Sequence, residues 1–459
     1  MGPQAEDRFH QRGGSGTGQA LYDSRFFGQF TDVMVMIIGA GIGGLTAALS
    51  LHAAGIDCTV IEAVAELKPL GVGINLQPHA VRELVELGLG EELAQTGIAT
   101  SALRYATCRG DVVLTVPRGR AAGYRWPQVS IHRGQLQMLL LDAVVDRLGP
   151  DAVRTGLSFD GFAPGAVEPG GTGPVGVRLR ESATGQLVKD GADVVVGADG
   201  LHSAVRALLH PREDELRWSG ITMWRGITEA DPFFDGATMV VAGTQLGAKI
   251  IAYPICPKAR ARGRALVNWV AEVRTAPAGT PATEADWWRS GRLADVQPHY
   301  TGWVLPYLNV PELIAQADRI LEYPMVDKAP LQRWGTGRVT LLGDAAHPMY
   351  PVGSNGGSQA VLDARYLALA LTAEPEPAAA LARYEHERRR QTDGLVTSGH
   401  RFEVDDLVRL AEQRAPGGFT DITAVLTAQE LSRAADAHRR VADMDVQALN
   451  ERPSWSVSC

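Results

Sequence analysis

The pattern of apolar and polar positions is most regular near the N-terminus, where three consecutive segments follow different periods. Val33 to Ile38 is a short continuous apolar run, which is typical of a strand buried on both faces. Leu45 to Ala54 has helical spacing, and a second apolar run, Cys58 to Ile61, ends at Glu62. Together they predict a βαβ unit. Residues 1–31 are polar and glycine-rich without apolar periodicity, so we predict a disordered extension there.

Later segments predict a larger sheet, a second domain and a helical end. Val194–Val196 and Val339–Leu342 are apolar runs followed by glycine, and we expect them to be further parallel strands of the first sheet. Between residues 205 and 320 the pattern changes to spaced aromatic and β-branched residues, which favours a mostly antiparallel sheet. From about residue 376 the chain is rich in Ala, Arg and Glu at helical spacing.

Composition and charge narrow the classes of protein. With 459 residues, 45% hydrophobic and 21% charged, the chain has room for about two or three domains. A formal net charge of -8 argues against nucleic-acid binding, and we interpret the basic cluster Arg388–Arg390 as a solvated helix face. No apolar run approaches the roughly 20 residues of a membrane helix, and no signal peptide is evident. We therefore expect a cytoplasmic protein without membrane contact, and the sequence does not indicate an oligomeric state.

The cysteines give no framework for disulfides or metal. They are scattered without a CxxC spacing, which fits a reducing compartment and predicts no metal site; they are Cys58, Cys108, Cys256 and Cys459.

The first motif that carries chemistry is a glycine-rich turn between the first strand and the first helix. In Gly39-x-Gly41-x-x-Gly44 the first glycine permits a tight turn, the second lets the backbone approach a pyrophosphate, and the third lets helix pack on strand. Ile42 and Gly43 complete the segment. Glu62 follows the second strand, where a carboxylate can accept hydrogen bonds from ribose hydroxyls. The motif predicts dinucleotide binding, although alone it does not separate FAD from NAD.

A later motif, some three hundred residues along the chain, makes that separation. A buried strand ending in Gly343-Asp344 would direct a carboxylate at the ribityl hydroxyls of a cofactor already held at Gly41. A loop that leads into a helix at Ser358 then offers backbone N–H groups and a helix dipole to the anionic edge of a reduced flavin; its residues are Pro351, Gly353, Asn355, Gly356 and Gly357. We interpret His347 as a loop-stabilising residue. The pair of motifs predicts FAD.

The predicted fold class is therefore α/β. It consists of a Rossmann-like FAD-binding domain, a substrate domain built on a mixed or antiparallel sheet, and a C-terminal helical region. The expected boundaries are 1–31 for the extension, 32–204 and 321–400 for a discontinuous FAD-binding domain, 205–320 for the substrate domain and 401–459 for the C-terminal helical segment.

Three motifs together resemble the class A, single-component FAD-dependent aromatic hydroxylases of the para-hydroxybenzoate and salicylate hydroxylase type. In chain order, the first motif is Gly39–Gly44, the second is Gly197–Arg206 and the third is Gly343–Gly357. The resemblance implies that Asp199 lies near both FAD and a passing nicotinamide, and that Arg133 contacts FAD.

Other segments resemble, within that family, the methylphenazine-carboxylate monooxygenases of phenazine biosynthesis. They are Leu70–Asn75, which contains Gly73 as a further cofactor contact, Ile221–Gly226 and Tyr323–Asp327. Because these segments fall largely in structural strands and loops, they leave the substrate open.

The family resemblance implies a mechanism and a kind of substrate. NADH or NADPH reduces FAD and leaves, molecular oxygen reacts, and an aromatic or N-heteroaromatic ring is hydroxylated through a flavin C4a-hydroperoxide, with loss of a carboxylate if the attacked carbon bears one. We expect the pocket to lie where the aromatic-rich sheet covers the ring end of FAD, with Trp224, Arg225, Tyr253 and Tyr350 as substrate contacts. No residue is assigned as catalytic. Arg225 could hold a carboxylate or stack as a structural residue, and Tyr253 could polarise a phenol or belong to the core.

Three other classes of protein compete with this interpretation. A flavin halogenase or ring reductase would share both FAD motifs. A plain NAD dehydrogenase would have no use for Gly343-Asp344, and a protein that keeps FAD only as structure would not oxidise NAD(P)H. The sequence contains no GK[ST] loop, HExxH or GxSxG motif.

Overall fold

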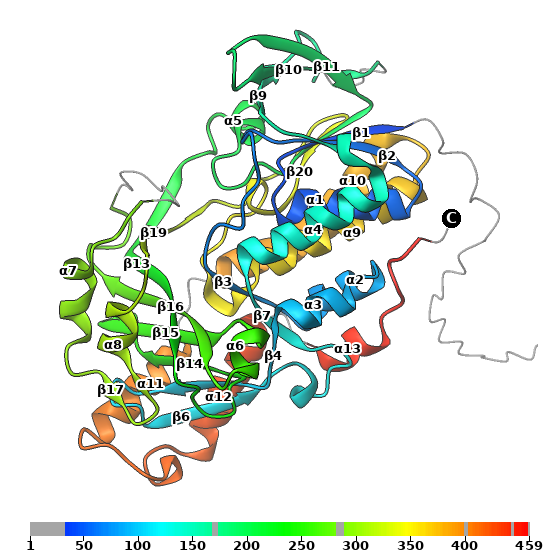
Figure 1. Ribbon diagram of the computed structural model, residues 1–459. Helices are drawn as coiled ribbons and strands as arrows, with labels where there is room; N and C mark the ends of the chain where they lie inside the picture. The colour runs from blue at the N-terminus through cyan, green and yellow to red at the C-terminus, as the bar shows by residue number, and fades with distance from the viewer. Residues whose placement is uncertain (1–32, 168–172, 281–288, 399–402, 442–444, 458–459) are drawn as a thin grey trace, which may run out of the picture.

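The computed structural model describes residues 33–167, 173–280, 289–398, 403–441 and 445–457. The extension predicted for residues 1–31 lies outside them, as do Trp287 and Trp288 of the aromatic-rich region. The described chain forms a layered α/β unit beside a large sheet, as Figure 1 shows. The α/β fold class is thereby confirmed, together with its C-terminal helices.

Five parallel strands form the sheet that the apolar runs predicted. Their order is β20-β12-β1-β2-β8, and Val35 of β1 pairs with Val194 of β12 while Ile38 pairs with Ile61 of β2. Segments far apart in sequence therefore share one sheet. The strands are β1 (Met34–Ile38), β2 (Asp57–Ile61), β8 (Val153–Arg154), β12 (Val194–Gly197) and β20 (Val339–Leu341).

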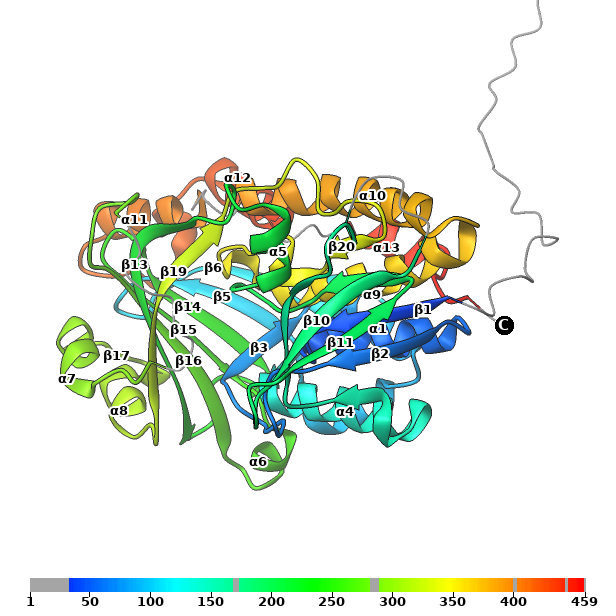
Figure 2. The same cartoon turned by 90° about the horizontal axis from the view of Figure 1, so that it is seen from above.

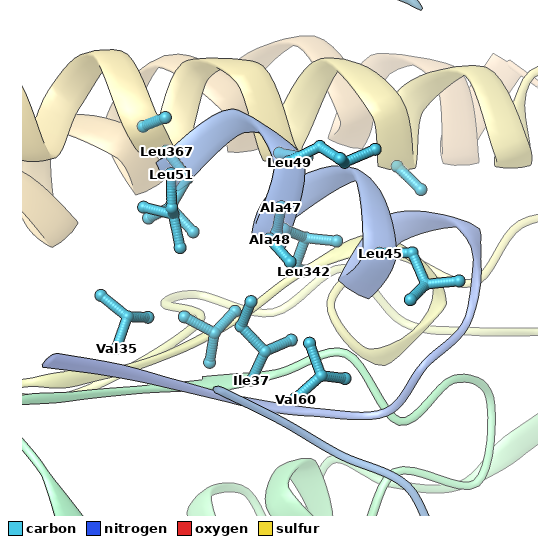
Figure 3. Packing of buried hydrophobic residues seen from close by; sticks show 14 of the residues in the cluster. Val35, Ile37, Leu45, Ala47, Ala48, Leu49, Leu51, Val60, Leu342 and Leu367 are labelled. Atoms are coloured by element: carbon cyan, nitrogen blue, oxygen red, sulfur yellow. The ribbon is translucent and has the colours of Figure 1, made fainter. Parts of the chain in front are cut away.

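Aliphatic side chains join this sheet to its helices. α1 follows β1 after a short turn and packs against α4 and α9. Figure 3 shows side chains of this cluster, and those named here are at most 1% exposed; they are Val35, Ile37, Leu45, Leu49, Leu51, Val60, Leu342 and Leu367. This burial fixes where β1 ends and α1 begins, and hence the turn between them. The helices are α1 (Ile42–Ala53), α2 (Pro78–Glu86), α3 (Gly90–Thr96), α4 (Arg133–Leu148), α5 (Ala204–Leu209), α9 (Gly356–Ala373) and α10 (Pro377–Ser398).

A seven-stranded sheet forms the second unit. Its order is β19-β13-β16-β15-β14-β5-β6, antiparallel except for the parallel pair β14 and β5. Two of its strands, β5 and β6, come from before residue 205, because the chain crosses to this sheet early and returns. The strands are β5 (Ala102–Ala106), β6 (Val112–Pro117), β13 (Leu216–Ala230), β14 (Thr238–Gly243), β15 (Ala248–Pro254), β16 (Ala265–Arg274) and β19 (Ile320–Lys328). Three short helices accompany them, α6 (Pro257–Ala261), α7 (Leu293–Val296) and α8 (Val310–Ala315).

Small sheets complete the architecture. In Figures 1 and 2, β3 lies between the parallel sheet and the seven-stranded sheet. The order β3-β7-β4 joins β3 (Gly73–Leu76), β7 (Gln128–His132) and β4 (Ile98–Thr100). The order β11-β10-β9 joins β11 (Leu187–Ala192), β10 (Val175–Glu181) and β9 (Leu157–Phe162), and β17 (Val304–Leu305) pairs with β18 (Leu308–Asn309).

The C-terminal helices cover both units. Helices α11 (Glu403–Arg414) and α12 (Ala428–Val441) pack on β5 and β6 through a small apolar cluster that includes Val113 and Leu407. α13 (Val446–Glu451) returns to α2, where the Arg82 guanidinium donates a hydrogen bond to the Leu449 carbonyl at 3.0 Å. None of the helices in the described part of the chain is long and apolar enough to span a membrane. The described residues also contain no cluster of three or more His, Cys, Asp or Glu suited to a metal ion.

Candidate active site

A groove of about 450 Å³ lies at the carboxyl ends of β1, β2 and β12. In open α/β sheets, ligands bind in the crevice outside these strand ends. The lining residues come from separate parts of the chain, and they include Gly39, Gly41, Glu62, Arg133, Asp199 and Gly200. The groove therefore brings together the first and second sequence motifs.

The four glycines of the first motif have different environments. Gly39 has φ +110°, and a Cβ there would lie 2.5 Å from the Ala198 carbonyl oxygen. A Cβ on Gly44 would overlap the Gly39 carbonyl, and one on Gly43 would lie 2.5 Å from Leu342 Cδ2. Around Gly41, in contrast, no atom lies within 4 Å of such a Cβ. Gly41 thus leaves a space at the start of α1 that a side chain would fill, and this space fits a pyrophosphate.

Helix α1 begins without a side-chain cap. Its N-cap is Gly41 and its first residue is Ile42, which is 8% exposed. The first N–H groups of a helix have no partner within the helix, so they are available to an anion in the groove. This arrangement fits the phosphates of a dinucleotide.

Glu62 lies at the groove but already accepts two backbone hydrogen bonds. Its Oε2 accepts from the Ala40 N–H at 2.8 Å, and its Oε1 accepts from the Val64 N–H at 2.9 Å. These bonds hold the carboxylate at the turn after β2. Because each carboxylate oxygen has a second lone pair, Glu62 can still accept from a ribose hydroxyl.

Asp199 has a local structural partner. Ser203 Oγ donates to its Oδ1 at 2.5 Å and the Val205 N–H to its Oδ2 at 3.2 Å, so the carboxylate stabilises the start of α5. Burial raises the pKa of Asp199, and these hydrogen bonds oppose that rise. The carboxylate lines the groove while it orders the turn that follows β12.

Arg206 ties the second motif to the third. Its buried guanidinium donates through Nη1 to the carbonyls of Ala345 at 3.2 Å and Ala346 at 2.8 Å. Arg206 is the last residue of the Gly197–Arg206 motif, but no role was predicted for it from the sequence. Its signal was a charged residue in an otherwise apolar helix.

The third motif places Asp344 directly after β20. Gly343 adopts φ +61°. The Asp344 residue is exposed to solvent, although protein atoms surround its carboxylate closely enough to desolvate it. Desolvation raises the pKa of Asp344, and the charges of His347 and Arg133 oppose this. Within the described residues its carboxylate accepts no hydrogen bond. Asp344 therefore has the lone pairs that a polyhydroxyl chain requires.

The loop after Asp344 turns into the N-terminus of α9. Pro351 precedes a short 3₁₀ turn in which Gly353 has φ +74°, and Asn355 is the N-cap of α9. Gly356 and Gly357 form the first turn of the helix, where the backbone amides and the dipole favour an anion.

Arg133 begins α4 and faces both halves of the site. It lines the groove of the first motif, and its charge acts on Asp344 of the third. A cation in this position can bind a cofactor that extends from one motif to the other.

Arg388 contradicts the prediction of a solvated basic face. It is fully buried, and its Nε donates to Asp363 Oδ1 at 2.8 Å. Asp363 Oδ2 accepts from the Gly343 N–H at 3.0 Å and pairs with His347 Nε2 at 2.6 Å. Burial tends to raise the pKa of Asp363, but the charges of His347 and Arg388 outweigh it and lower that pKa. Arg388 is buried because α9 supplies a buried carboxylate opposite it.

The proposed substrate contacts divide between two faces of the seven-stranded sheet. Successive side chains of a strand point to opposite faces, so Trp224 and Arg225 of β13 separate. Trp224 packs with Trp269 and Tyr300, and its indole N–H donates to Glu322 Oε2 at 2.9 Å. The structure therefore does not bring Trp224 to the face that carries Arg225.

Arg225 and the tyrosines lie on the face toward β3. Tyr350 packs with Tyr323 and Met223, and Tyr253 donates its hydroxyl to the Gly73 carbonyl of β3 at 2.9 Å. The Arg225 guanidinium stacks over the Tyr323 ring, 4.7 Å from its centroid. Within the described residues the buried Arg225 Nε has no hydrogen-bond partner.

Comparison with known proteins decides the family. The family described as FAD binding domain matches residues 32–288 and 310–398. The chain belongs to this family. It is a FAD-dependent, NAD(P)H-consuming monooxygenase of the aromatic hydroxylase type.

Named relatives agree with this assignment. A phenazine 1,6-dicarboxylic acid hydroxylase of Lysobacter antibioticus is 52% identical over 368 residues, which cover 80% of this chain and 89% of that protein. The aurachin C monooxygenase/isomerase of Stigmatella aurantiaca is 33% identical over 375 residues, 81% of this chain and 89% of that protein.

A solved structure shows the same fold. The HpxO protein of Klebsiella pneumoniae, complexed with FAD and uric acid, superposes with a TM-score of 0.69 at 26% identity, covering 91% of this chain and 99% of that one. FAD is thus the cofactor of the family.

Proposed function

We propose that this FAD-dependent aromatic hydroxylase acts on an N-heteroaromatic carboxylic acid of the phenazine type. One ring C–H, or a ring carbon that bears the carboxylate, becomes C–OH. In the first case one substrate, O₂, NAD(P)H and a proton give the hydroxylated product, NAD(P)⁺ and water. In the second case the same reactants give these products and CO₂, which leaves as the C–C bond to the carboxylate breaks. The name of the relative at 52% identity supports the substrate class.

The observation that carries the proposal is the environment of the Arg225 guanidinium. It is half-buried on the face toward β3, and its Nε lacks a partner within the described residues. An arginine presents a planar fork of N–H donors that matches a carboxylate bidentately. The Tyr323 ring against which it stacks also offers an apolar surface to an aromatic substrate. The proposal assigns the substrate carboxylate to Arg225.

The cofactor would be held along the site from the groove to the start of α9. We assign the pyrophosphate to Gly41 and the start of α1, a ribose to Glu62, the ribityl chain to Asp344, and the ring end to the amides of Gly356 and Gly357. The space at Gly41 and the unbonded Asp344 carboxylate support this assignment. Bound FAD supplies hydride acceptance from NAD(P)H and activation of O₂. The protein orients the ring and excludes water.

The proposal is tested by NAD(P)H oxidation with FAD-loaded enzyme. Phenazine 1,6-dicarboxylic acid, salicylate and unsubstituted phenazine are compared, with ¹⁸O₂ as oxidant and product analysis by mass. We expect label in a hydroxylated product from the phenazine acid and little turnover of phenazine itself. Stimulated NAD(P)H oxidation by phenazine equal to that by its dicarboxylic acid would refute the role of the carboxylate.

The same assay compares NADH with NADPH as the reductant. We also propose a cytoplasmic location, because that compartment supplies reduced nicotinamide, and a small aromatic molecule as the binding partner. Antibody detection in fractionated cells would test the location.

A further inference from the structure

Gly73 of the short strand β3 is hydrogen-bonded on both sides to the seven-stranded sheet. The Gly73 N–H donates to Asn268 Oδ1 at 2.6 Å, and its carbonyl accepts from the Tyr253 hydroxyl at 2.9 Å. Tyr253 lies on β15 and Asn268 on β16, and the two residues are directly opposite in the register of these strands. They are 4% and 0% exposed. The two peptide groups that flank Gly73 are therefore each hydrogen-bonded to one of two adjacent buried side chains. We call this pair, Tyr253 and Asn268, the clamp.

The clamp requires an unusually close approach of the two units. A Cβ on Gly73 would lie 2.6 Å from Asn268 Cβ, so only glycine fits between them. This environment explains a glycine within a strand, where glycine otherwise weakens pairing. Gly73 was predicted from the family resemblance as a cofactor contact, and Tyr253 as a substrate contact. The structure connects the two positions by a hydrogen bond.

The other end of β3 is fixed to the third FAD motif. The backbone N–H of Gln77 donates to Ser358 Oγ at 2.9 Å, and its side-chain amide donates to the Gly353 carbonyl at 2.9 Å. Ile74 lies against the first turn of α9, since a Cβ on Gly357 would be 3.7 Å from Ile74 Cδ1. A strand of four residues thus joins the face that carries Arg225 to the loop assigned to the ring end of FAD.

We propose that Tyr253 and Asn268 are positioning residues that set the distance between the bound substrate and the ring end of FAD. The part of this proposal that concerns turnover rests on the proposed function. Displacing reacting groups by about 1 Å can lower a rate about a hundredfold. Where transfer to the substrate fails, NAD(P)H, O₂ and a proton yield NAD(P)⁺ and hydrogen peroxide. Loss of the clamp is therefore expected to uncouple NAD(P)H oxidation from hydroxylation.

The variant Tyr253→Phe removes one hydrogen bond and keeps the ring. Tyr300→Phe is its matched control, because the Tyr300 hydroxyl is also buried and donates to a backbone carbonyl, that of Lys249, at 2.7 Å. Tyr300 packs on the opposite face of the same sheet, with Trp269. Each substitution removes a buried hydroxyl from the same unit, but only Tyr253→Phe acts on β3.

Two measurements follow on each variant. With phenazine 1,6-dicarboxylic acid, we expect the hydroxylated product formed per NAD(P)H to fall by about threefold or more in Tyr253→Phe and in Asn268→Ala, with peroxide making up the difference. In Tyr300→Phe the ratio should stay at the wild-type value. The second measurement needs no substrate: the visible circular dichroism of bound FAD should change in Tyr253→Phe and Asn268→Ala and stay the same in Tyr300→Phe.

The outcomes separate this inference from the proposed function. If wild-type enzyme makes no product from the phenazine acid, the proposed substrate is wrong, and the dichroism of bound FAD still decides the role of the clamp. Wild-type dichroism in both Tyr253→Phe and Asn268→Ala would overturn the inference. It would also be overturned if Tyr300→Phe altered the spectrum as much as Tyr253→Phe, since a general loss of stability would then explain both.

Discussion

Substitution of Gly41 tests most directly how the chain holds its cofactor. Gly41 has φ -73° and ψ -180°, a conformation that alanine adopts without strain. No atom lies within 4 Å of the position that a Cβ would occupy. The apo-protein should therefore tolerate Gly41→Ala, because a small loss of helix capping and a small gain from a less flexible unfolded chain, each about 0.5–1 kcal/mol, nearly cancel.

The effect on FAD should be large. The methyl group would occupy the space assigned to the pyrophosphate and move it away from the first N–H groups of α1. Loss of one or two charge-assisted hydrogen bonds, at about 1.5–3 kcal/mol each, corresponds to an increase of about a hundredfold in the dissociation constant. At an FAD concentration a hundred times the wild-type dissociation constant, the stabilisation by FAD would fall from about 2.7 to about 0.4 kcal/mol.

The assay is chemical unfolding of apo-protein and of FAD-saturated protein, with FAD affinity measured by fluorescence titration. Gly44→Ala is the control, because its Cβ would overlap the Gly39 carbonyl and should destabilise the apo-protein itself by about 1–3 kcal/mol or more. Unchanged FAD affinity in a folded Gly41→Ala protein would refute the assignment of the pyrophosphate to this turn.

Three further predictions concern charged and titratable groups. Arg225→Ala should raise the KM for the aromatic acid about ten- to hundredfold. It should lower the free energy of unfolding by only about 1 kcal/mol, because it removes the stack on Tyr323 while the Arg225 Nε has no hydrogen-bond partner in the described residues; an unchanged KM would disprove the carboxylate role. Asp363→Asn should destabilise the protein by about 3–5 kcal/mol in urea unfolding, because Arg388 would keep a buried charge without its anion; a loss below about 1 kcal/mol would show that the pair is not a stabilising one. Burial, with the charges of Arg388 and Arg452, lowers the pKa of His79 to about 3. The unfolded chain therefore takes up a proton below about pH 6.5 that the folded chain excludes, and stability should fall as the pH drops from 6.5 toward 3. Across this pH range the urea midpoint should fall less steeply with decreasing pH in His79→Gln than in the wild type. An equally steep fall would show that His79 does not cause the loss of stability.

The elements that local pattern determines were predictable. The glycines of the first motif, β1, α1 and β2 follow from residues within one short segment, and the structure confirms each element. The opposite placement of Trp224 and Arg225 was also contained in the sequence, since neighbours in a strand face opposite sides. The prediction that Trp224 and Arg225 both line one pocket overlooked this two-residue alternation of side chains.

Other features depend on partners that are distant in the chain. The burial of Arg388 depends on Asp363, 25 residues earlier on another helix, and charge spacing alone gave no sign of it. The bond between Tyr253 and Gly73 spans 180 residues. Membership of β5 and β6 in the seven-stranded sheet likewise depends on a parallel pairing with β14 that no local period indicates. The domain boundaries proposed from the sequence stay a prediction.

The strand order of the parallel sheet also affects how the protein is made. β1 is synthesised first, and its neighbour β12 pairs with the edge strand β20, for example Val196 with Thr340. Because β20 comes about 300 residues after β1, the sheet lacks this edge strand until late in synthesis. At about 5–20 residues per second, a ribosome needs on the order of 15–60 s to cover that distance. During this time the Gly39 turn exists without Asp344, which lies at the end of β20. Capture of FAD across both motifs must therefore follow the synthesis of β20 and Asp344. When riboflavin, the precursor of FAD, is scarce, the two motifs of a nascent chain would have no shared ligand to hold them together.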